Sequence, residues 1–321
     1  MKKLRVLCAF LMYSILLCGC TTANKDPISK TGIYFDTVIS IKIYDSQDTE
    51  LLDQCFAFCE EFEYTVSRTI ETSDISKINN SKGTPVTVSD TTIELLEKGI
   101  YYSELTNGAF DITIAPLSEL WDFKNNPGEV PSNEDIQNAL THVGYENILI
   151  EGNTVTLLDP DMAIDLGGIA KGYMADQLKE YLVSQGVESA LIDLGGNLLA
   201  VGSKPDGSNY TIGIKKPFKE GEMISTESIH DLSVVTSGCY ERYFKVDDKM
   251  YHHILDTTTG YPVDNELYGV TIFSEKSVDG DALSTSCFAL GLEDGIKLIE
   301  SLDGVDALFV TSEYELVDTR N

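Results

Sequence analysis

A short glycine turn between an apolar run and a helical pattern constrains this chain more than any other feature. Met162, Ala163 and Ile164 form an apolar run typical of a short buried strand, and Gly167 and Gly168 end it. Apolar residues then recur at helical spacing, at Ile169, Tyr173, Met174, Leu178, Tyr181 and Leu182. The segment is therefore predicted to be a strand, a tight turn and a helix.

The chemistry of this turn favours an anionic ligand. Free backbone N–H groups and the helix dipole attract negative charge at a helix N-terminus. Lys171 falls in the first helical turn and adds a positive charge, while Asp165 lies at the end of the strand. These groups suit a phosphate-bearing ligand, alone or together with a metal ion. A plain strand–turn–helix connection with a surface lysine explains the same residues equally well, because no standard nucleotide-binding signature is met.

The N-terminus has the pattern of an export signal. Lys2, Lys3 and Arg5 precede an apolar run over residues 6–17, which is too short for a comfortable membrane span. The run ends in Leu-Cys-Gly-Cys at residues 17–20, which resembles a bacterial lipobox. We predict a signal peptide at 1–19, lipidation of Cys20 and a tether over 20–30. An ordinary secretory signal with an incidental cysteine is the alternative.

This pattern predicts an exported lipoprotein, anchored to a bacterial cell membrane and facing outside the cytoplasm. The net charge of −29 becomes −32 once residues 1–19 are removed. Such an acidic body repels nucleic acid, so no nucleic-acid partner is expected. Any polyphosphate ligand must be attracted by a local positive group or a divalent cation. Four cysteines would remain unmodified, and without a second Cys/His pair at zinc-site spacing we favour buried free thiols, at Cys55, Cys59, Cys239 and Cys287.

Periodicity predicts an α+β fold, since helical and strand patterns alternate irregularly. Helices are predicted at 48–66, 74–80, 90–106, 135–143, 169–186, 278–290 and 293–302. Strands are predicted at 37–44, 85–88, 147–150, 153–158, 189–194, 198–201, 210–216, 232–238, 240–246, 269–273 and 307–311. Residues 109–117 are either a functional stretch after a turn or a plain edge strand ended by Pro116. We expect mixed and antiparallel sheets with flanking helices, in two intimately packed subdomains over 31–321.

Two further groups carry ligand chemistry. Asp281 and Thr285 are four residues apart on a predicted helix, hence on one face. Their oxygens suit Mg²⁺ or Ca²⁺, although by themselves an N-terminal acid and an outward threonine are the more common explanation. His252 and His253 are adjacent and point to opposite faces of a strand, so only one can line a given site. That histidine could be a general base or a structural residue.

Six blocks occur in a fixed order and together resemble one family. They are Thr-Val-Ile-Ser at 37–40, Gly-Ala-Phe-Asp-Ile-Thr at 108–113, Asp-Leu-Gly-Gly-Ile-Ala-Lys-Gly-Tyr at 165–173, Asp-Leu-Gly-Gly-Asn at 193–197, His-His-Ile-Leu-Asp-Thr-Thr-Thr-Gly at 252–260 and Asp-Ala-Leu-Ser-Thr at 281–285. This order resembles the ApbE family of FAD:protein FMN transferases. The resemblance extends over residues 30–318.

The resemblance implies Mg²⁺-dependent transfer of FMN from FAD to a threonine or serine hydroxyl of a target protein, with release of AMP. It implies metal ligands at Gly168 (backbone oxygen), Asp281 and Thr285, and a general base at His253. FAD contacts carry over to Phe35, Ala109, Phe110, Asp111, Asp165, Lys171 and Leu255. The chain departs from the family at Phe35-Asp36, where many members have Met-Gly, and a polar contact near residues 68–70 has no clear counterpart.

The implied acceptor is an exported subunit of a flavin-linked electron-transport system or an FMN-binding domain. The chain has no Asp-x-x-Ser/Thr-Gly-Ala-Ser/Thr acceptor segment of its own, so self-modification is not expected. Two alternatives stay open: an FAD pyrophosphatase that uses water on the same site, and a non-enzymatic flavin-binding lipoprotein. The set formed by Asp281, Thr285 and His253 argues against simple storage.

Overall fold

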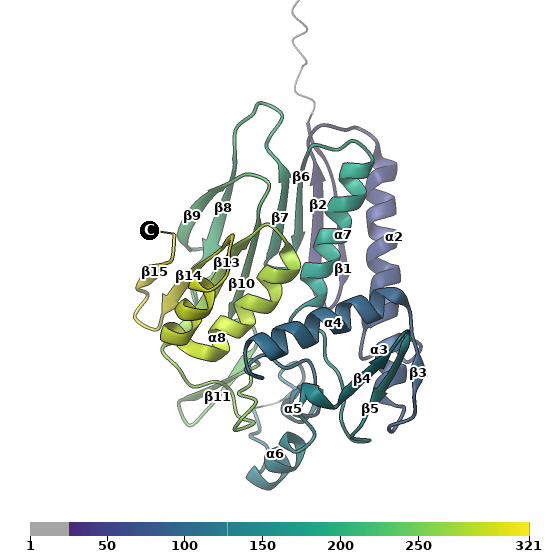
Figure 1. Ribbon diagram of the computed structural model, residues 1–321. Coiled ribbons are helices and arrows are strands. Elements are labelled where there is room, and N and C mark those ends of the chain that lie inside the picture. The colour runs from purple at the N-terminus through teal and green to yellow at the C-terminus, as the bar shows by residue number, and fades with distance from the viewer. Residues whose placement is uncertain (1–25, 127, 321) are drawn as a thin grey trace, which may run out of the picture.

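The computed structural model describes residues 26–126 and 128–320, and its centre is an eight-stranded antiparallel sheet (Figure 1). The strand order is β1-β2-β6-β7-β10-β13-β14-β15, and neighbouring strands pair antiparallel. The strands are β1 (Ile28–Tyr34), β2 (Thr37–Ile43), β6 (Ser189–Leu194), β7 (Asn197–Gly202), β10 (Ser233–Gly238), β13 (Leu267–Ser274), β14 (Val305–Thr311) and β15 (Leu316–Asp318).

Three long helices cover one face of this sheet: α2 (Thr49–Val66), α7 (Ala170–Ser184) and α8 (Ser277–Glu300) (Figure 1). The period-2 alternation of β2 places Ile39, Ile41 and Ile43 in the main core, each fully buried. A second, smaller core involves the hairpin of β8 (Tyr210–Lys215) and β9 (Met223–Ile229), where Tyr210 and Ile214 pack with residues of the sheet strands.

A second part of the molecule lies below the sheet in Figure 1. It contains α3 (Asp74–Asn79), α4 (Asp90–Leu105), α5 (Ala115–Trp121), α6 (Asn133–Leu140), the short helix η1 (Tyr145–Asn147), a sheet of β3 (Val86–Thr87), β4 (Ile148–Glu151) and β5 (Thr154–Leu157), and the hairpin β11 (Tyr243–Val246) with β12 (Lys249–His252). Fully buried Trp121 anchors a small core there. The main core continues through both parts, which confirms the predicted α+β fold with intimately packed subdomains.

The helices predicted at 278–290 and 293–302 are both present within α8, and the non-helical backbone of Gly291, at φ 79° and ψ −179°, kinks the chain between them. Three differences from the predicted elements have local causes. Residues 115–121 form α5 rather than part of an edge strand, because Pro116 suits the first turn of a helix. Ala163 makes a single bridge to Ile114 rather than a strand. Ser89, not Asp90, caps α4.

The boundary of the predicted tether was wrong, because β1 begins at Ile28 and pairs with β2 from that residue onward. The predicted signal peptide and Cys20 lie outside the described residues. Among the residues described, no helix is long and apolar enough to cross a bilayer. Cys55, Cys59, Cys239 and Cys287 are buried free thiols, as predicted.

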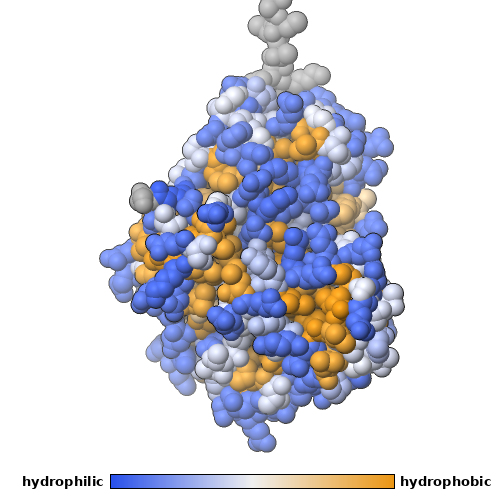
Figure 2. Space-filling view, in the orientation of Figure 1, coloured by the Kyte–Doolittle hydropathy of each residue, from blue (hydrophilic) through white to orange (hydrophobic). Residues whose placement is uncertain are grey.

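Hydrophilic residues cover most of the face shown in Figure 2. Apolar residues gather there over the region of α8 and β14 and over the region of α4 and β4.

Candidate active site

The glycine turn at residues 165–168 brings backbone close to two other elements. Asp165 Oδ1 accepts a hydrogen bond of 2.8 Å from the Gly167 N–H, which closes the turn just before α7 begins. A Cβ on Gly168 would lie 2.9 Å from the Phe110 ring and 3.7 Å from Thr285 Oγ1. Gly168 therefore lies between the predicted FAD loop and the predicted metal helix, where no side chain would fit easily.

Lys171 and Asp281 meet beside this turn. Lys171 Nζ lies 3.2 and 3.4 Å from the two carboxylate oxygens of Asp281 and 3.1 Å from the Gly167 carbonyl oxygen. Asp281 Oδ2 also accepts the Gly172 N–H at 2.9 Å. The aspartate is only 3% exposed. Its carboxylate is held in place by these contacts with the first turn of α7.

Thr285 lies one turn further along α8 and completes a group of oxygen donors. Its Oγ1 is 3.1 Å from Ser237 Oγ of β10, which is 2.8 Å from Ser284 Oγ. A carboxylate, hydroxyls and the nearby Gly168 backbone are the hard oxygen ligands that Mg²⁺ prefers. The residues present therefore fit the cation that the sequence predicts.

Helices α7 and α8 are held together by Gly172 and Asp176. A Cβ on Gly172 would lie 2.3 Å from the Ser277 carbonyl oxygen, so glycine permits the close approach. Asp176 accepts the N–H groups of Ser277 and Val278 at 2.8 and 3.0 Å, at the N-terminus of α8. Burial raises the pKa of this carboxyl to about 6, against the opposing effect of those hydrogen bonds. The contact fixes where Asp281 and Thr285 stand relative to the glycine turn.

The two histidines differ as the strand geometry predicts. His252 is buried, its Nε2 lies 2.9 Å from the Val263 carbonyl oxygen, and burial lowers its pKa to about 4. His253 donates its backbone N–H to the Arg242 carbonyl at 3.1 Å and is half-buried. Its Nδ1 is buried without a hydrogen-bond partner among the described residues, which leaves Nε2 as the nitrogen available to a ligand.

Burial favours the neutral form of the His253 ring. Burial lowers its pKa to about 3, and the nearby charges of Arg242 and Lys171 act in the same direction. A neutral imidazole can accept a proton, which is one requirement of a general base.

The residues predicted to contact FAD lie in different surroundings. Phe110 is buried beside Gly168, and Ala109 precedes it in the same half-buried loop. Asp111 directs its carboxylate into the protein: Oδ1 accepts from Thr113 N and Oγ1 at 2.7 and 2.6 Å, and Oδ2 accepts from Tyr145 N at 3.0 Å. Burial raises the pKa of the Asp111 carboxyl. Its observed contacts therefore shape the loop.

Leu255 and Phe35 lie in different places. Leu255 is 5% exposed and packs in the small core around Trp121. Phe35 and Asp36 form the two-residue turn between β1 and β2, with φ 52° and 56°. Positive φ is uncommon for a bulky residue; here the Phe35 N–H bonds Glu63 Oε1 at 2.7 Å, and its ring packs on Phe62 with centroids 5.7 Å apart.

Sequence reasoning missed Arg68, in the segment 68–70 that it left unassigned. Arg68 Nε lies 3.1 Å from Asp165 Oδ2, and its Nη1 lies 3.0 Å from Glu119 Oε1. In the sequence, Arg68 is a basic residue among polar ones directly after a predicted helix. Many surface loops share this pattern, so it does not indicate a site.

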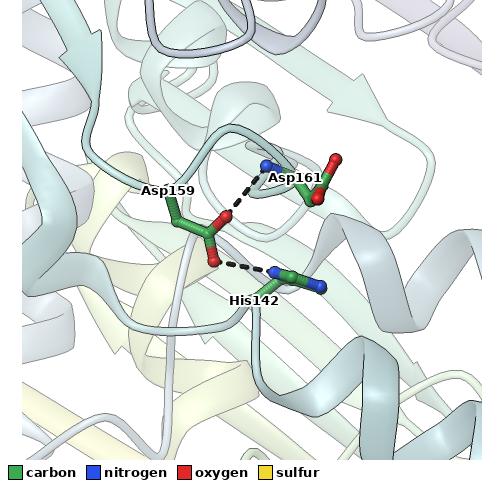
Figure 3. A group of neighbouring side chains, drawn as sticks. All are labelled: His142, Asp159 and Asp161. Atoms are coloured by element: carbon green, nitrogen blue, oxygen red, sulfur yellow. Dashed lines mark hydrogen bonds and ion pairs between the residues drawn. The ribbon is translucent and has the colours of Figure 1, made fainter.

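His142, Asp159 and Asp161 form a group of ligand-type side chains, none of which was predicted to bind metal (Figure 3). His142 Nδ1 lies 2.7 Å from Asp159 Oδ2, and Asp159 Oδ1 accepts the Asp161 N–H at 2.9 Å. Lys82 Nζ neutralises Asp161 at 3.0 Å. These contacts account for the charges of the group.

The fold matches that of a solved flavin transferase. A flavin transferase from Vibrio cholerae has a TM-score of 0.81 to this chain at 29% identity, covering 91% of this chain and 96% of that one. The ApbE protein of Thermotoga maritima has a TM-score of 0.85 at 33% identity, with 92% and 97% covered.

Sequence comparison gives the family. The model of the ApbE family matches residues 35–309. An FAD:protein FMN transferase of Klebsiella pneumoniae (strain 342) is 38% identical over 293 residues, 90% of each chain, and one of Treponema pallidum (strain Nichols) is 32% identical over 320 residues, 92% of this chain and 88% of that one. The chain belongs to the ApbE family.

Proposed function

We propose that this enzyme transfers FMN from FAD to a threonine or serine hydroxyl of another protein, releases AMP, and requires Mg²⁺. The observation that carries the proposal is the convergence of the glycine turn, Asp281 and Thr285 with a neutral histidine. Lys171 touches Asp281 directly, and Thr285 lies beside Gly168. His253 is near enough to Lys171 for the lysine charge to lower its pKa.

Asp281, Thr285 and the Gly168 carbonyl would hold the Mg²⁺ ion. When bound, the ion would neutralise the negative charge of the pyrophosphate, because that charge otherwise repels an incoming nucleophile. Lys171 and the backbone N–H groups of the turn would bind the phosphates, since a protein with net charge −29 needs a local positive group for that task. Phe35, Ala109, Phe110, Asp111, Asp165 and Leu255 are proposed to contact FAD or to shape the loops that do.

In the transfer step the acceptor hydroxyl oxygen attacks the phosphorus of the FMN half. The bond from that phosphorus to the bridging oxygen breaks, and AMP leaves with that oxygen. His253 Nε2 would accept the hydroxyl proton, which requires a neutral ring, and the lowered pKa of this histidine supports that form. In the FAD pyrophosphatase alternative, water takes the place of the hydroxyl; in the carrier alternative, no bond changes.

We also propose that residues 1–19 are removed and that a lipid on Cys20 anchors the enzyme at the outer side of the cytoplasmic membrane. The basic residues, short apolar run and lipobox-like sequence at the N-terminus support this proposal. The acceptor would then be an exported protein of a flavin-linked electron-transport system.

The test uses the protein with FAD, Mg²⁺ and a soluble domain that carries an Asp-x-x-Ser/Thr-Gly-Ala-Ser/Thr segment. Covalent flavin fluorescence on that domain, with AMP released in equal amount, supports transfer. AMP and free FMN formed at the same rate without the domain would instead establish a pyrophosphatase. Asp281→Ala should abolish Mg²⁺-dependent activity, whereas Asp294→Ala, which removes an exposed acid of the same helix, should not. Full activity of Asp281→Ala would reject the metal assignment.

His253→Ala separates a base from a ligand residue. The variant should slow transfer and leave FAD binding unchanged. Loss of FAD binding would show that His253 holds the nucleotide.

A further inference from the structure

An open pocket of about 400 Å³ lies where the β1–β2 turn, the segment after α5 and the start of β11 come together. It is lined by Asp36, Phe123, Lys124, Glu241, Arg242 and Tyr243. None of these residues is among those predicted to hold FAD or Mg²⁺. The pocket is large enough for a few residues of a polypeptide.

The pocket adjoins the proposed base. The Arg242 carbonyl accepts the His253 N–H at 3.1 Å, so one wall of the pocket is bonded to the backbone of that histidine. Arg242 and Lys171 both act electrostatically on the His253 ring. Lys171 belongs to the proposed phosphate side and Arg242 to the pocket, so His253 is within electrostatic reach of both.

The charges of the pocket cancel, unlike those of a phosphate site. Two basic residues oppose two acidic ones among the lining residues, and Lys124 Nζ lies 2.6 Å from Asp36 Oδ1. No lining cation is in excess to offset the phosphates of a nucleotide against a protein of net charge −29. A polypeptide segment with polar side chains needs no such excess.

The aromatic wall of the pocket is packed against neighbouring rings and is partly exposed. Phe123 stacks between Trp121 and Phe244, with ring centroids 5.5 and 5.4 Å apart. Tyr243 is 42% exposed, and its ring meets Phe218 edge-on at 5.4 Å. Aromatic residues and arginine in a preformed hollow are typical of protein-binding hot spots.

We infer that this pocket docks the segment of the acceptor protein that flanks the modified hydroxyl, and so delivers that hydroxyl to His253. The inference depends on the proposed transferase function. It assigns acceptor recognition to Asp36 of the β1–β2 turn, the segment after α5 and the start of β11. Phe35 of the same turn stays assigned to FAD, so the two regions meet there.

The test measures the KM for the acceptor and the KM for FAD separately, with a soluble acceptor domain that carries the Asp-x-x-Ser/Thr-Gly-Ala-Ser/Thr segment. Lys124→Glu and Tyr243→Ala should each raise the acceptor KM about tenfold, the effect of losing one hot-spot contact, and leave the FAD KM within about twofold. Matched controls are Lys297→Glu and Tyr64→Ala, which alter a similarly exposed lysine and tyrosine elsewhere. Both controls should behave as wild type.

Three results would overturn the inference. A rise in the FAD KM would assign the pocket to the nucleotide, flavin ring included. An unchanged acceptor KM in both pocket variants would show that the acceptor docks elsewhere. Equal effects in the control variants would show a general surface effect. Failure of the wild-type protein to label the acceptor domain at all would instead count against the proposed function.

Discussion

Gly172 is where the architecture of the site can be tested by adding a single methyl group. A Cβ at this position would lie 2.3 Å from the Ser277 carbonyl oxygen and 2.7 Å from the Ser277 carbonyl carbon and the Val278 Cα. Ordinary contacts begin at 3.4 Å, so α7 and α8 must separate by about 1 Å in a close-packed interior. The obstacle is backbone, which cannot rotate away as a side chain can.

The energetic cost can be built from named contacts. Overpacking of this kind costs about 1–3 kcal/mol. Moving the start of α8 also stretches the two hydrogen bonds that Asp176 accepts from Ser277 and Val278, each worth about 1.5–3 kcal/mol when fully lost. Alanine returns up to about 1 kcal/mol of helix propensity. With partial relaxation we expect Gly172→Ala to lower the free energy of unfolding by about 2–4 kcal/mol.

The same shift should reach the chemistry. The Gly172 N–H donates to Asp281 Oδ2 at 2.9 Å, and the neighbouring Lys171 contacts the same carboxylate. A displacement of about 1 Å can reduce a rate by about 100-fold. Guanidinium unfolding and the rate of flavin transfer measure the two effects. Gly213→Ala is the control, because its Cβ would meet the flexible and exposed side chain of Met223 instead of backbone. The reasoning is refuted if Gly172→Ala is no less stable and no less active than Gly213→Ala.

Two further predictions concern charge. Asp176→Ala should destabilise the protein by about 2 kcal/mol in urea unfolding at pH 7, because two buried N–H donors lose their acceptor. Burial of the carboxylate, which raises the Asp176 pKa to about 6, is unfavourable in the wild type and offsets part of that loss. An effect no larger than that of Asp294→Ala, at an exposed position, would contradict the prediction. For His253, the active form of the base is the neutral ring, which exists above its pKa. Because that pKa is lowered to about 3, kcat/KM for the acceptor should show no acid limb near pH 6.5 and should stay level down to about pH 5. A limb centred near pH 6.5 in the wild type that His253→Ala removes would show that the ring titrates normally.

Local sequence patterns predicted most of the fold because they depend on neighbouring residues. The amphipathic pattern of residues 48–66 and the strand alternation of 37–44 correspond to α2 and β2 within one or two residues. β9 and β15 were missed: β9 is mostly polar and packs through few buried residues, and β15 is three residues long. β1 was missed because its alternating burial begins inside a polar segment that was assigned to the tether. Pairing partners decide such strands, and they lie far away in the sequence.

The site could be predicted only in part for the same reason. The family resemblance placed Gly168, Asp281 and Thr285 together; in the structure Gly168 lies beside Thr285, and Asp281 accepts a hydrogen bond from Gly172 at the start of α7. The ion pair of Arg68 with Asp165 joins positions 97 residues apart, and no local pattern announces it. Likewise, Asp111 could be expected to meet a ligand from its place in a motif, but its buried contacts to Thr113 and Tyr145 depend on a chain segment that folds back later.

The repeated tetrad Asp-Leu-Gly-Gly shows why identical letters need not mean identical structure. In residues 193–196, Gly195 and Gly196 have φ 68° and 96° and form the two-residue turn between β6 and β7. In residues 165–168 neither glycine has positive φ, and the chain continues into α7. In both copies the aspartate Oδ1 accepts the N–H of the first glycine, at 2.8 and 3.1 Å. The shared part of the motif is thus the aspartate turn, and the glycine conformations decide whether a strand or a helix comes next.

The glycines of the two copies therefore have different tasks. A Cβ on Gly195 would lie 1.9 Å from Thr37 Oγ1, so the second copy packs against the residue directly after the Phe35–Asp36 turn. A Cβ on Gly168 would meet Phe110, so the first copy packs against the loop predicted to contact FAD. One copy sets the position of the β1–β2 turn, which borders the pocket inferred to receive the acceptor, and the other forms the proposed phosphate site. Because β6 and α7 are both anchored in the main core, the two glycine turns hold the two proposed binding regions at a fixed separation from each other.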